Sequence, residues 1–269
     1  MVDLFMRHPG GFLVRRFLAA LAVAGLVASS VGAAQAQQAA QPNWSGLYFG
    51  ASYGVAANSI KGSFVTSPTL NHLDASGNSQ FRSGYVGLQH QWGQFVLGAE
   101  ASYGGTGWSD DWDARTHGPN ARCVQQLAGI ATIDCRARID SLVTVGPRIG
   151  FAPSNQWLLF ATGGYANARI DTSVFDVAAN TEIGRSSNRH SGWFAGGGIE
   201  YSYSANLSFG LEYQHVSLDT TRHFDSKFGN GGCCIVTPET RDMSGDSDII
   251  KLRSTFKFNR PEPVAEPMK

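Results

Sequence analysis

The sequence predicts an all-β protein, an eight-stranded antiparallel transmembrane up-and-down β-barrel with short periplasmic turns and long extracellular loops. Apolar residues alternate with small or polar ones in eight segments, which is the period of a strand with two different faces. After residue 36 no apolar run reaches the length of about 20 residues that a spanning helix needs. The connections between the segments alternate between short and long, as they do in outer-membrane barrels.

The first 36 residues carry the features of a secretory signal peptide. The apolar run FLAALAVAGLVASSVG follows three arginines and precedes the small-x-small motif Ala34-Gln35-Ala36. We therefore expect cleavage after Ala36. The rest divides into a short periplasmic segment at 37–43, the barrel at 44–258 and a Pro-rich tail at 259–269.

The first four segments with period two lie at 45–56, 81–92, 94–104 and 136–151. Bulky apolar groups mark the face that we expect to contact lipid, because no water reaches that face. These groups are Leu47, Phe49, Tyr53, Val55, Val86, Leu88, Phe95, Leu97, Tyr103, Ile139, Val143, Val145, Ile149 and Phe151.

The fifth segment, 157–168, is apolar on both faces, so its pattern does not assign a face to lipid. The sixth and seventh flank the break Ser204-Ala205-Asn206, and the eighth lies at 248–258. Their lipid-facing groups are Trp193, Ile199, Tyr201, Phe209, Leu211, Tyr213, Ile250, Leu252, Phe256 and Phe258.

Short connections fall at Gly93, at APSNQ and at SYSAN, and long ones at 57–80, 105–135, 169–190 and 219–247. Tyr and Trp near the short-turn ends are typical of an interfacial girdle. The expected girdle residues are Trp44, Trp92, Trp157, Tyr201 and Tyr203.

The opposite face of the strands points into the lumen, which in an eight-stranded barrel is only wide enough to hold side chains. It carries a predicted charge network of Glu100, Arg138, Asp140, Arg148, Glu200, Glu212, Lys251, Arg253 and Lys257. Four of these fall at similar depths, and we expect a salt-bridge layer there because buried charges need partners. They are Glu100, Arg148, Glu212 and Arg253.

Several stretches resemble one family of small outer-membrane β-barrel proteins of α-proteobacteria, the porin-family or outer-membrane immunogenic proteins. They are NWSGLYFGASYG, VTVGPRIGF with NQWLLFATGGYANARI, SGWFAGGGIEYSYSANLSFGLEYQHVSL and IIKLRSTFKF. The resemblance covers about residues 43–258. It implies that Phe258 is the terminal-strand aromatic residue read by the barrel-assembly machinery, although here a tail follows it.

Four cysteines, Cys123, Cys135, Cys233 and Cys234, follow the secretion signal. An even number in an oxidising compartment favours disulfides, and the resemblance does not account for them. Cys123 with Cys135 is one simple pair, whereas joining the adjacent Cys233 and Cys234 would strain disulfide geometry. Two cross-links between the second and fourth long loops are the alternative.

Basic and acidic residues balance at 21 each, so the sequence implies no nucleic-acid surface. The resemblance implies a non-enzymatic outer-membrane protein with a structural or surface-interaction role. We expect no cofactor. The expected partners are outer-membrane lipid and lipopolysaccharide, the assembly machinery, and an extracellular ligand or host surface reached through the loops.

Three other functions are alternatives. A small-solute porin is disfavoured, because aqueous porins need about 16–18 strands. A lipid A-modifying enzyme is suggested by His215-Val216-Ser217, since lipid A deacylases of this architecture use a His-x-Ser pair with a Glu. Metal or haem binding is the third alternative, and its candidate ligands are His190, His223 and the adjacent Cys233 and Cys234. Their spacing matches no recognised site, so we expect the two histidines to be solvated loop residues.

Overall fold

The computed structural model describes residues 43–64, 72–106, 114–118, 133–176, 180–224 and 240–258. Nine β-strands occupy most of these residues: β1 (Gly46–Phe64), β2 (His72–Trp92), β3 (Phe95–Gly105), β4 (Ala114–Gly118), β5 (Ile133–Ser154), β6 (Trp157–Asp176), β7 (Thr181–Ser202), β8 (Leu207–Phe224) and β9 (Thr240–Phe258). Within the described part of the chain, no helix is long and apolar enough to cross a membrane.

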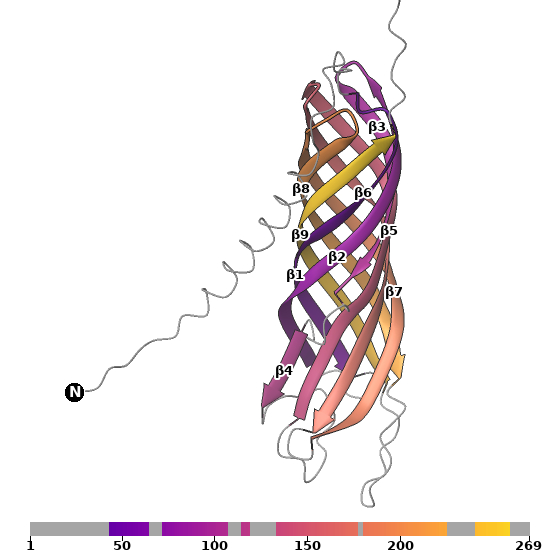
Figure 1. The fold of residues 1–269 in the computed structure, drawn as a ribbon. Helices are drawn as coiled ribbons and strands as arrows, with labels where there is room; N and C mark the ends of the chain where they lie inside the picture. The colour runs from indigo at the N-terminus through magenta and orange to yellow at the C-terminus, as the bar shows by residue number, and fades with distance from the viewer. Residues whose placement is uncertain are drawn as a thin grey trace, which may run out of the picture. The chain divides into compact units, whose positions relative to one another are not determined.

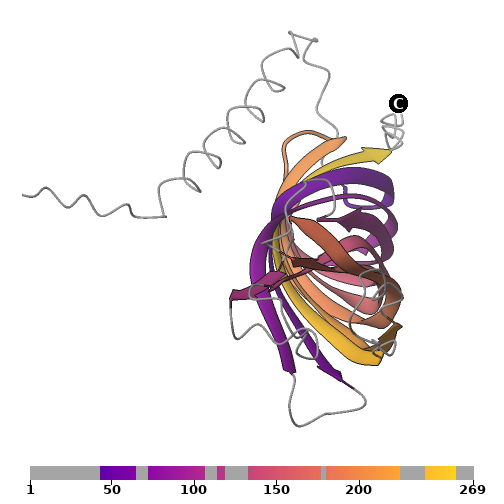
Figure 2. The ribbon, with the colours of Figure 1, turned by 90° about the horizontal axis from the view of Figure 1, so that it is seen from below.

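Eight long strands form a closed antiparallel barrel, which confirms the predicted fold class (Figures 1 and 2). Each strand pairs with the next long strand along the chain, and β9 pairs with β1 from Leu47–Phe258 to Phe64–Arg241. Closure leaves no free sheet edge in the part of the barrel nearest the short turns, as a sheet in lipid requires. The ninth strand, β4, is a short addition that pairs with the start of β5 and meets β2 at one position.

Tight connections join β2 to β3, β5 to β6 and β7 to β8 at one end of the barrel, called here the turn end. Gly93, in the first of them, has a φ of +59°, which glycine adopts without steric cost. The other end, called here the loop end, carries the longer connections and β4 (lower end in Figure 1). This alternation is the one that the sequence predicts.

The strands extend further toward the loop end than the sequence pattern indicates. β5 and β7 each have 22 residues, and β1 and β9 each have 19. The prediction that 57–80, 169–190 and 219–247 are loops is therefore wrong for much of each range. Beyond the lipid-facing part the outer surface becomes polar, so the alternation that marks a strand in sequence fades while the pairing continues.

A belt of exposed apolar side chains surrounds the half of the barrel nearest the turn end. Phe95, Leu88 and Tyr103 have 60% or more of their surface exposed, although apolar groups of this size usually avoid water. The belt comprises residues 47–53, 86–92, 95–103, 143–151, 157–165, 193–203, 209–213 and 250–258. Five of these eight stretches have nine to eleven residues, which matches a transmembrane β-strand of about 9–11 residues.

β6 is apolar on both faces because its outward residues belong to the belt and its inward residues pack in an apolar cluster inside the barrel. Trp157 and Leu159 are exposed on the belt, whereas Leu158 and Phe160 are buried in a small cluster with Trp44. Trp44 is only 1% exposed, so its assignment to the interfacial girdle is wrong. It precedes β1 and folds into the turn end of the lumen.

A β-bulge in the pairing of β5 with β6, between Ile139 and Ser141, reverses which residues point inward. Ile139 is buried in the apolar interior of the barrel, so its assignment to the lipid face is wrong. Its neighbour Arg138 consequently lies on the outer face. The sequence does not predict this bulge, because the alternation of apolar and polar residues continues through Asp140.

Candidate functional site: the filled lumen and its rim

Arg253 is the centre of a buried cluster of charges inside the belt. Its side chain is fully buried, and its guanidinium donates to both carboxylate oxygens of Glu100 at 2.9 and 2.6 Å. It also donates to Glu212, and its Nε lies 3.1 Å from Glu200 Oε1. One arginine thus contacts three carboxylates from β3, β7 and β8.

Two further cations complete this cluster. Arg148 donates to Glu200 Oε1 at 2.7 Å and to Gln89 Oε1 at 2.8 Å. Lys251 lies 3.3 Å from Glu212 Oε1. The lumenal charge cluster therefore contains Glu100, Arg148, Glu200, Glu212, Lys251 and Arg253, three acids balanced by three bases.

Aromatic rings and neutral polar groups surround the lumenal charge cluster. The Arg148 guanidinium lies 4.0 Å from the ring centroid of Phe160, and that of Arg253 lies 3.9 Å from the ring centroid of Tyr85. Tyr48 donates its hydroxyl to Glu100 at 2.9 Å. Such pairing and hydrogen bonding offset the desolvation cost that makes isolated buried charges unfavourable.

The structure brings together six of the nine charged residues predicted to face the lumen. The expected depth layer of Glu100, Arg148, Glu212 and Arg253 is present, but Arg148 takes Glu200 as its acidic partner. Strand alternation gives the face of a residue and its depth, whereas this contact crosses the barrel interior from β5 to β7.

Lys257 faces the lumen but lies apart from the lumenal charge cluster, nearer the turn end. Its ammonium lies 4.0 Å from the ring centroid of Trp44 and donates to Ser202 Oγ at 3.3 Å. Lys257 and Trp44 therefore fill the lumen between the lumenal charge cluster and the turn end.

Arg138 and Asp140 do not lie in the lumen, and their assignment to the charge network is wrong. The β-bulge turns them to the outer face, where Arg138 lies 3.5 Å from Asp171 and 3.9 Å from Asp140. These pairs stand beyond the apolar belt, at the loop end.

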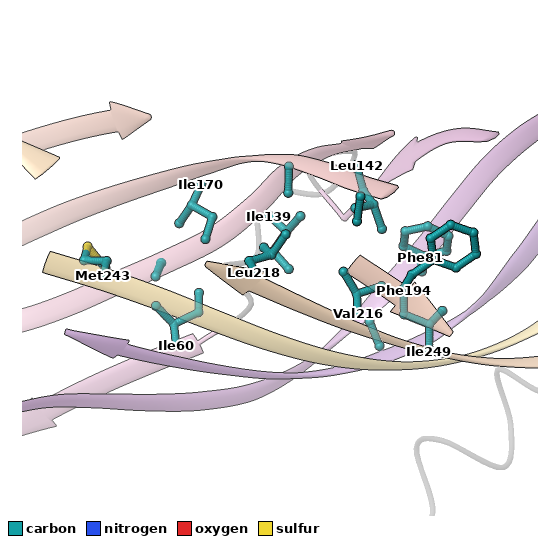
Figure 3. Close-up of a cluster of buried hydrophobic side chains, with 14 residues drawn as sticks. Ile60, Phe81, Ile139, Leu142, Ile170, Phe194, Val216, Leu218, Met243 and Ile249 are labelled. Atoms are coloured by element: carbon teal, nitrogen blue, oxygen red, sulfur yellow. The ribbon is translucent and has the colours of Figure 1, made fainter. Parts of the chain in front are cut away.

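An apolar cluster fills the lumen on the loop side of the charges. Along β9 the inward positions change from Lys257, Arg253 and Lys251 to Ile249 and Met243. Side chains from seven of the long strands meet there in a lumenal apolar cluster of fourteen members. Figure 3 shows these side chains gathered between the strands. They are Ala56, Ile60, Phe81, Ala137, Ile139, Leu142, Ala166, Ala168, Ile170, Phe194, Val216, Leu218, Met243 and Ile249.

A buried histidine pair lies beyond the belt. His190 Nε2 and His223 Nε2 are 2.7 Å apart, and both side chains are at most 1% exposed. The prediction that they are solvated loop residues is therefore wrong. Extending the alternation of β7 backwards from Phe194 places His190 on the inward face, and that signal was available in the sequence.

The hydrogen bonds of this pair suggest one arrangement of protons. The Asp219 carbonyl lies 3.1 Å from His190 Nδ1 and can only accept, so His190 donates there. Neutral His190 must then accept at Nε2 from His223. Ser186 Oγ, at 3.2 Å, donates in turn to His223 Nδ1. Two neutral rings satisfy these three contacts, whereas a proton added to His190 Nε2 would require His223 to accept there and to donate from Nδ1 to Ser186 instead.

Burial lowers the pKa of His190 below its usual value of 6.5, with the hydrogen bond to Asp219 opposing this in part. Below pH 6.5, His190 therefore binds a proton more readily in the unfolded chain than in the folded barrel. The free energy of unfolding should be at its full value above pH 6.5 and fall as the pH drops below it. We expect the urea midpoint of the refolded protein to fall between pH 7.5 and pH 5, and His190→Gln to reduce that fall. Replacing the exposed His90 by Gln is the control, and an equal pH response in all three proteins would contradict the assignment.

His215 and Ser217 lie on the outer face just beyond the belt, whereas Val216 between them belongs to the lumenal apolar cluster. Asp248 Oδ1 is 2.8 Å from His215 Nδ1 and accepts the Tyr213 hydroxyl at 2.6 Å. The carboxylate beside His215 is thus on the neighbouring strand, β9. Ser217 donates to Asp246 at 2.9 Å and makes no described contact with His215, so the histidine is not in place to activate it.

Several predictions concern residues that the structure does not describe. The signal cleavage after Ala36 and the tail at 259–269 lie outside the described residues, as do Cys123, Cys233 and Cys234. Cys135 belongs to β5, but its side chain is outside the described part as well. The disulfide pairing therefore stays a prediction.

Comparison with known proteins identifies the chain's family. The family model for the outer membrane protein beta-barrel domain matches residues 24–240. The chain is also 25% identical over 211 residues to the 31 kDa outer-membrane immunogenic protein of Brucella melitensis, a match that covers 75% of this chain and 82% of that protein. The match to the family model ends where β9 begins, so the closing strand is assigned by its pairing with β1 and β8.

Two solved structures resemble the fold at low sequence identity. The outer membrane protein OprG from Pseudomonas aeruginosa is 9% identical, with a TM-score of 0.49, over 81% of this chain and 99% of that one. The outer membrane protease OmpT from Escherichia coli is 11% identical, with a TM-score of 0.48, over 79% and 97% of the two chains. The family match and the closed barrel with its apolar belt show that this chain belongs to the outer membrane protein beta-barrel domain family and is an integral protein of the Gram-negative outer membrane.

Proposed function

We propose that this protein is a non-enzymatic component of the outer membrane, with a structural role in the envelope and an interaction role at the cell surface. The observation that supports this is the filled lumen. Lys257 with Trp44, the lumenal charge cluster and the lumenal apolar cluster follow one another along the barrel. A passage for solutes would have to cross all three.

The alternatives have weaker support. A small-solute channel needs a lumen open to water, whereas the inward side chains Arg148, Glu200 and Ile249 are each 1% exposed. A lipid A-modifying enzyme needs an activated nucleophile, and Ser217 is hydrogen-bonded to an aspartate instead of a histidine. Interaction partners would then meet the outer surface and the loop end.

Phe258 supports an expected contact with the barrel-assembly machinery. It is the last residue of β9, is 53% exposed and packs against Phe49 with ring centroids 5.5 Å apart. An exposed aromatic residue at the end of the closing strand is accessible to a factor that handles the strand before closure.

A deletion strain tests the proposed role. We expect loss of the protein to raise sensitivity to detergent and to chelators of divalent cations, with uptake of small sugars unchanged and the acyl composition of lipid A unaltered in mass spectra. Wild-type complementation should restore detergent resistance. Reduced sugar uptake would support a channel, and a changed number of lipid A acyl chains would support an enzyme, so either result would contradict the proposal.

A further inference from the structure

The outer face of β6 and β7 changes character in three steps just beyond the belt. The cross-strand partners are Tyr165 with Trp193, then Asn167 with Ser191, then two arginines, Arg169 and Arg189. Tyr165 and Trp193 are about half exposed and form the last aromatic step of the belt on these strands. The arginines follow four residues later, about 13 Å along the strand at about 3.3 Å per residue.

The two arginines are directly opposite each other, which is unfavourable for like charges on paired strands. Arg169 donates to Ser187 at 2.7 Å and lies 3.4 Å from Asp171, which also pairs with Arg138. Arg189 is exposed, and no carboxylate among the described residues pairs with its guanidinium. The outer face here therefore has excess positive charge, which an anion would relieve.

Polar groups lie between the aromatic step and the arginines. The Tyr165 hydroxyl and Ser191 Oγ are 2.9 Å apart, and Asn167 Nδ2 reaches them at 3.3 and 3.4 Å. Each of these groups can donate a hydrogen bond to an oxygen. Two hydroxyls, an amide and two guanidiniums on one patch suit a phosphate group that sits beside a sugar.

Position selects the source of that phosphate. Aromatic residues at the edge of a belt mark the membrane interface, and the loop end of the barrel faces outward. A group held between Tyr165 and the arginines would lie at the headgroups of the outer leaflet. Arginine residues near a membrane surface favour anionic headgroups by ~1 kcal/mol each.

We propose that the patch formed by Tyr165, Asn167, Ser191, Arg169 and Arg189 binds the phosphorylated sugar headgroup of the outer-leaflet glycolipid, lipid A. The proposal rests on the proposed function, because it names one partner of the surface that this function requires. The hydroxyls and the amide contact the sugar, and the guanidiniums contact the phosphate. Bidentate arginine contacts to phosphate are among the stronger hydrogen bonds that a protein makes.

Binding of bisphosphorylated lipid A to the refolded full chain in detergent micelles tests the proposal by native mass spectrometry. We expect Arg189→Gln to weaken binding about fivefold, equivalent to ~1 kcal/mol, and Arg169→Gln with Arg189→Gln to weaken it more. Arg222→Gln is the matched control, since Arg222 is an exposed arginine on β8 that pairs with Asp242 at 3.0 Å. It should leave binding unchanged.

Three results would overturn the proposal. They are unchanged binding in the double variant, equal weakening by Arg222→Gln, and equal binding of lipid A that lacks phosphate. Inorganic pyrophosphate that displaced lipid A at micromolar concentration would indicate a site for a soluble anion instead. Heat-modifiable mobility of each variant on unboiled gels reports the folded barrel separately. The detergent and sugar-uptake phenotypes of the deletion strain test the proposed function independently of this patch.

Discussion

Replacing Arg253 by Met should destabilise the barrel by roughly 3–5 kcal/mol, because it leaves three buried carboxylates without their shared cation. Arg253 is the residue that joins Glu100, Glu200 and Glu212. The expected result is a lower urea midpoint of the refolded protein and a lower temperature at which the folded band disappears from unboiled gels.

Two further variants make this result specific. Adding Glu100→Gln to the Arg253→Met variant removes one orphaned charge, so we expect part of the lost stability to return. Arg222→Gln, at an exposed ion pair, should change stability by about 1 kcal/mol or less. If Arg253→Met also stayed within about 1 kcal/mol of wild type, the charges would not be the interior support that the contacts indicate.

Gly164→Ala is the second change with a large expected effect, roughly 2–4 kcal/mol from backbone strain and overpacking combined. Gly164 has a φ of +154°, and a Cβ there would lie closer than 3.0 Å to the backbone of Val145 and Gly146 on the neighbouring strand. Val145 pairs with Tyr165, so its backbone cannot move away without disturbing the pairing of β5 with β6. We expect a much lower yield of refolded barrel and a lower urea midpoint.

Gly84→Ala is the matched control. It also replaces a glycine within a strand of the barrel, but the nearest atom to its new Cβ is the Gly50 carbonyl oxygen at 3.8 Å, an ordinary contact. We expect refolding close to wild type. Similar losses in both variants would mean that the requirement for glycine is general and does not arise from the close approach at Gly164.

The fold could be predicted wherever lipid imposes a strict pattern. From Phe209 to Tyr213, for example, every second residue is large and apolar, and the structure places those residues on the belt. Outside the belt water contacts the outer face, so residues such as Ser187 and Asn188 carry no signal of a strand, although they are paired in β7. Strand ends could not be predicted for that reason.

The lumenal charge cluster could be predicted in part from the sequence. Alternation gave the inward face of Glu212 and Arg253, but it could not show that Arg148 reaches Glu200 across the lumen. The bulge before Ser141 changed the face of Arg138 and Asp140 with no sequence mark. His223 follows a second irregularity, between Leu218 and Thr221, so its approach to His190 required the three-dimensional pairing.

Single-channel conductance of the purified, refolded protein in planar bilayers shows whether charged and apolar side chains close the lumen along its length. We expect no steady openings for the wild-type protein across a range of voltages in molar salt. Steady, ohmic openings from fully folded protein, unchanged in preparations purified to remove contaminating porins, would contradict a closed lumen.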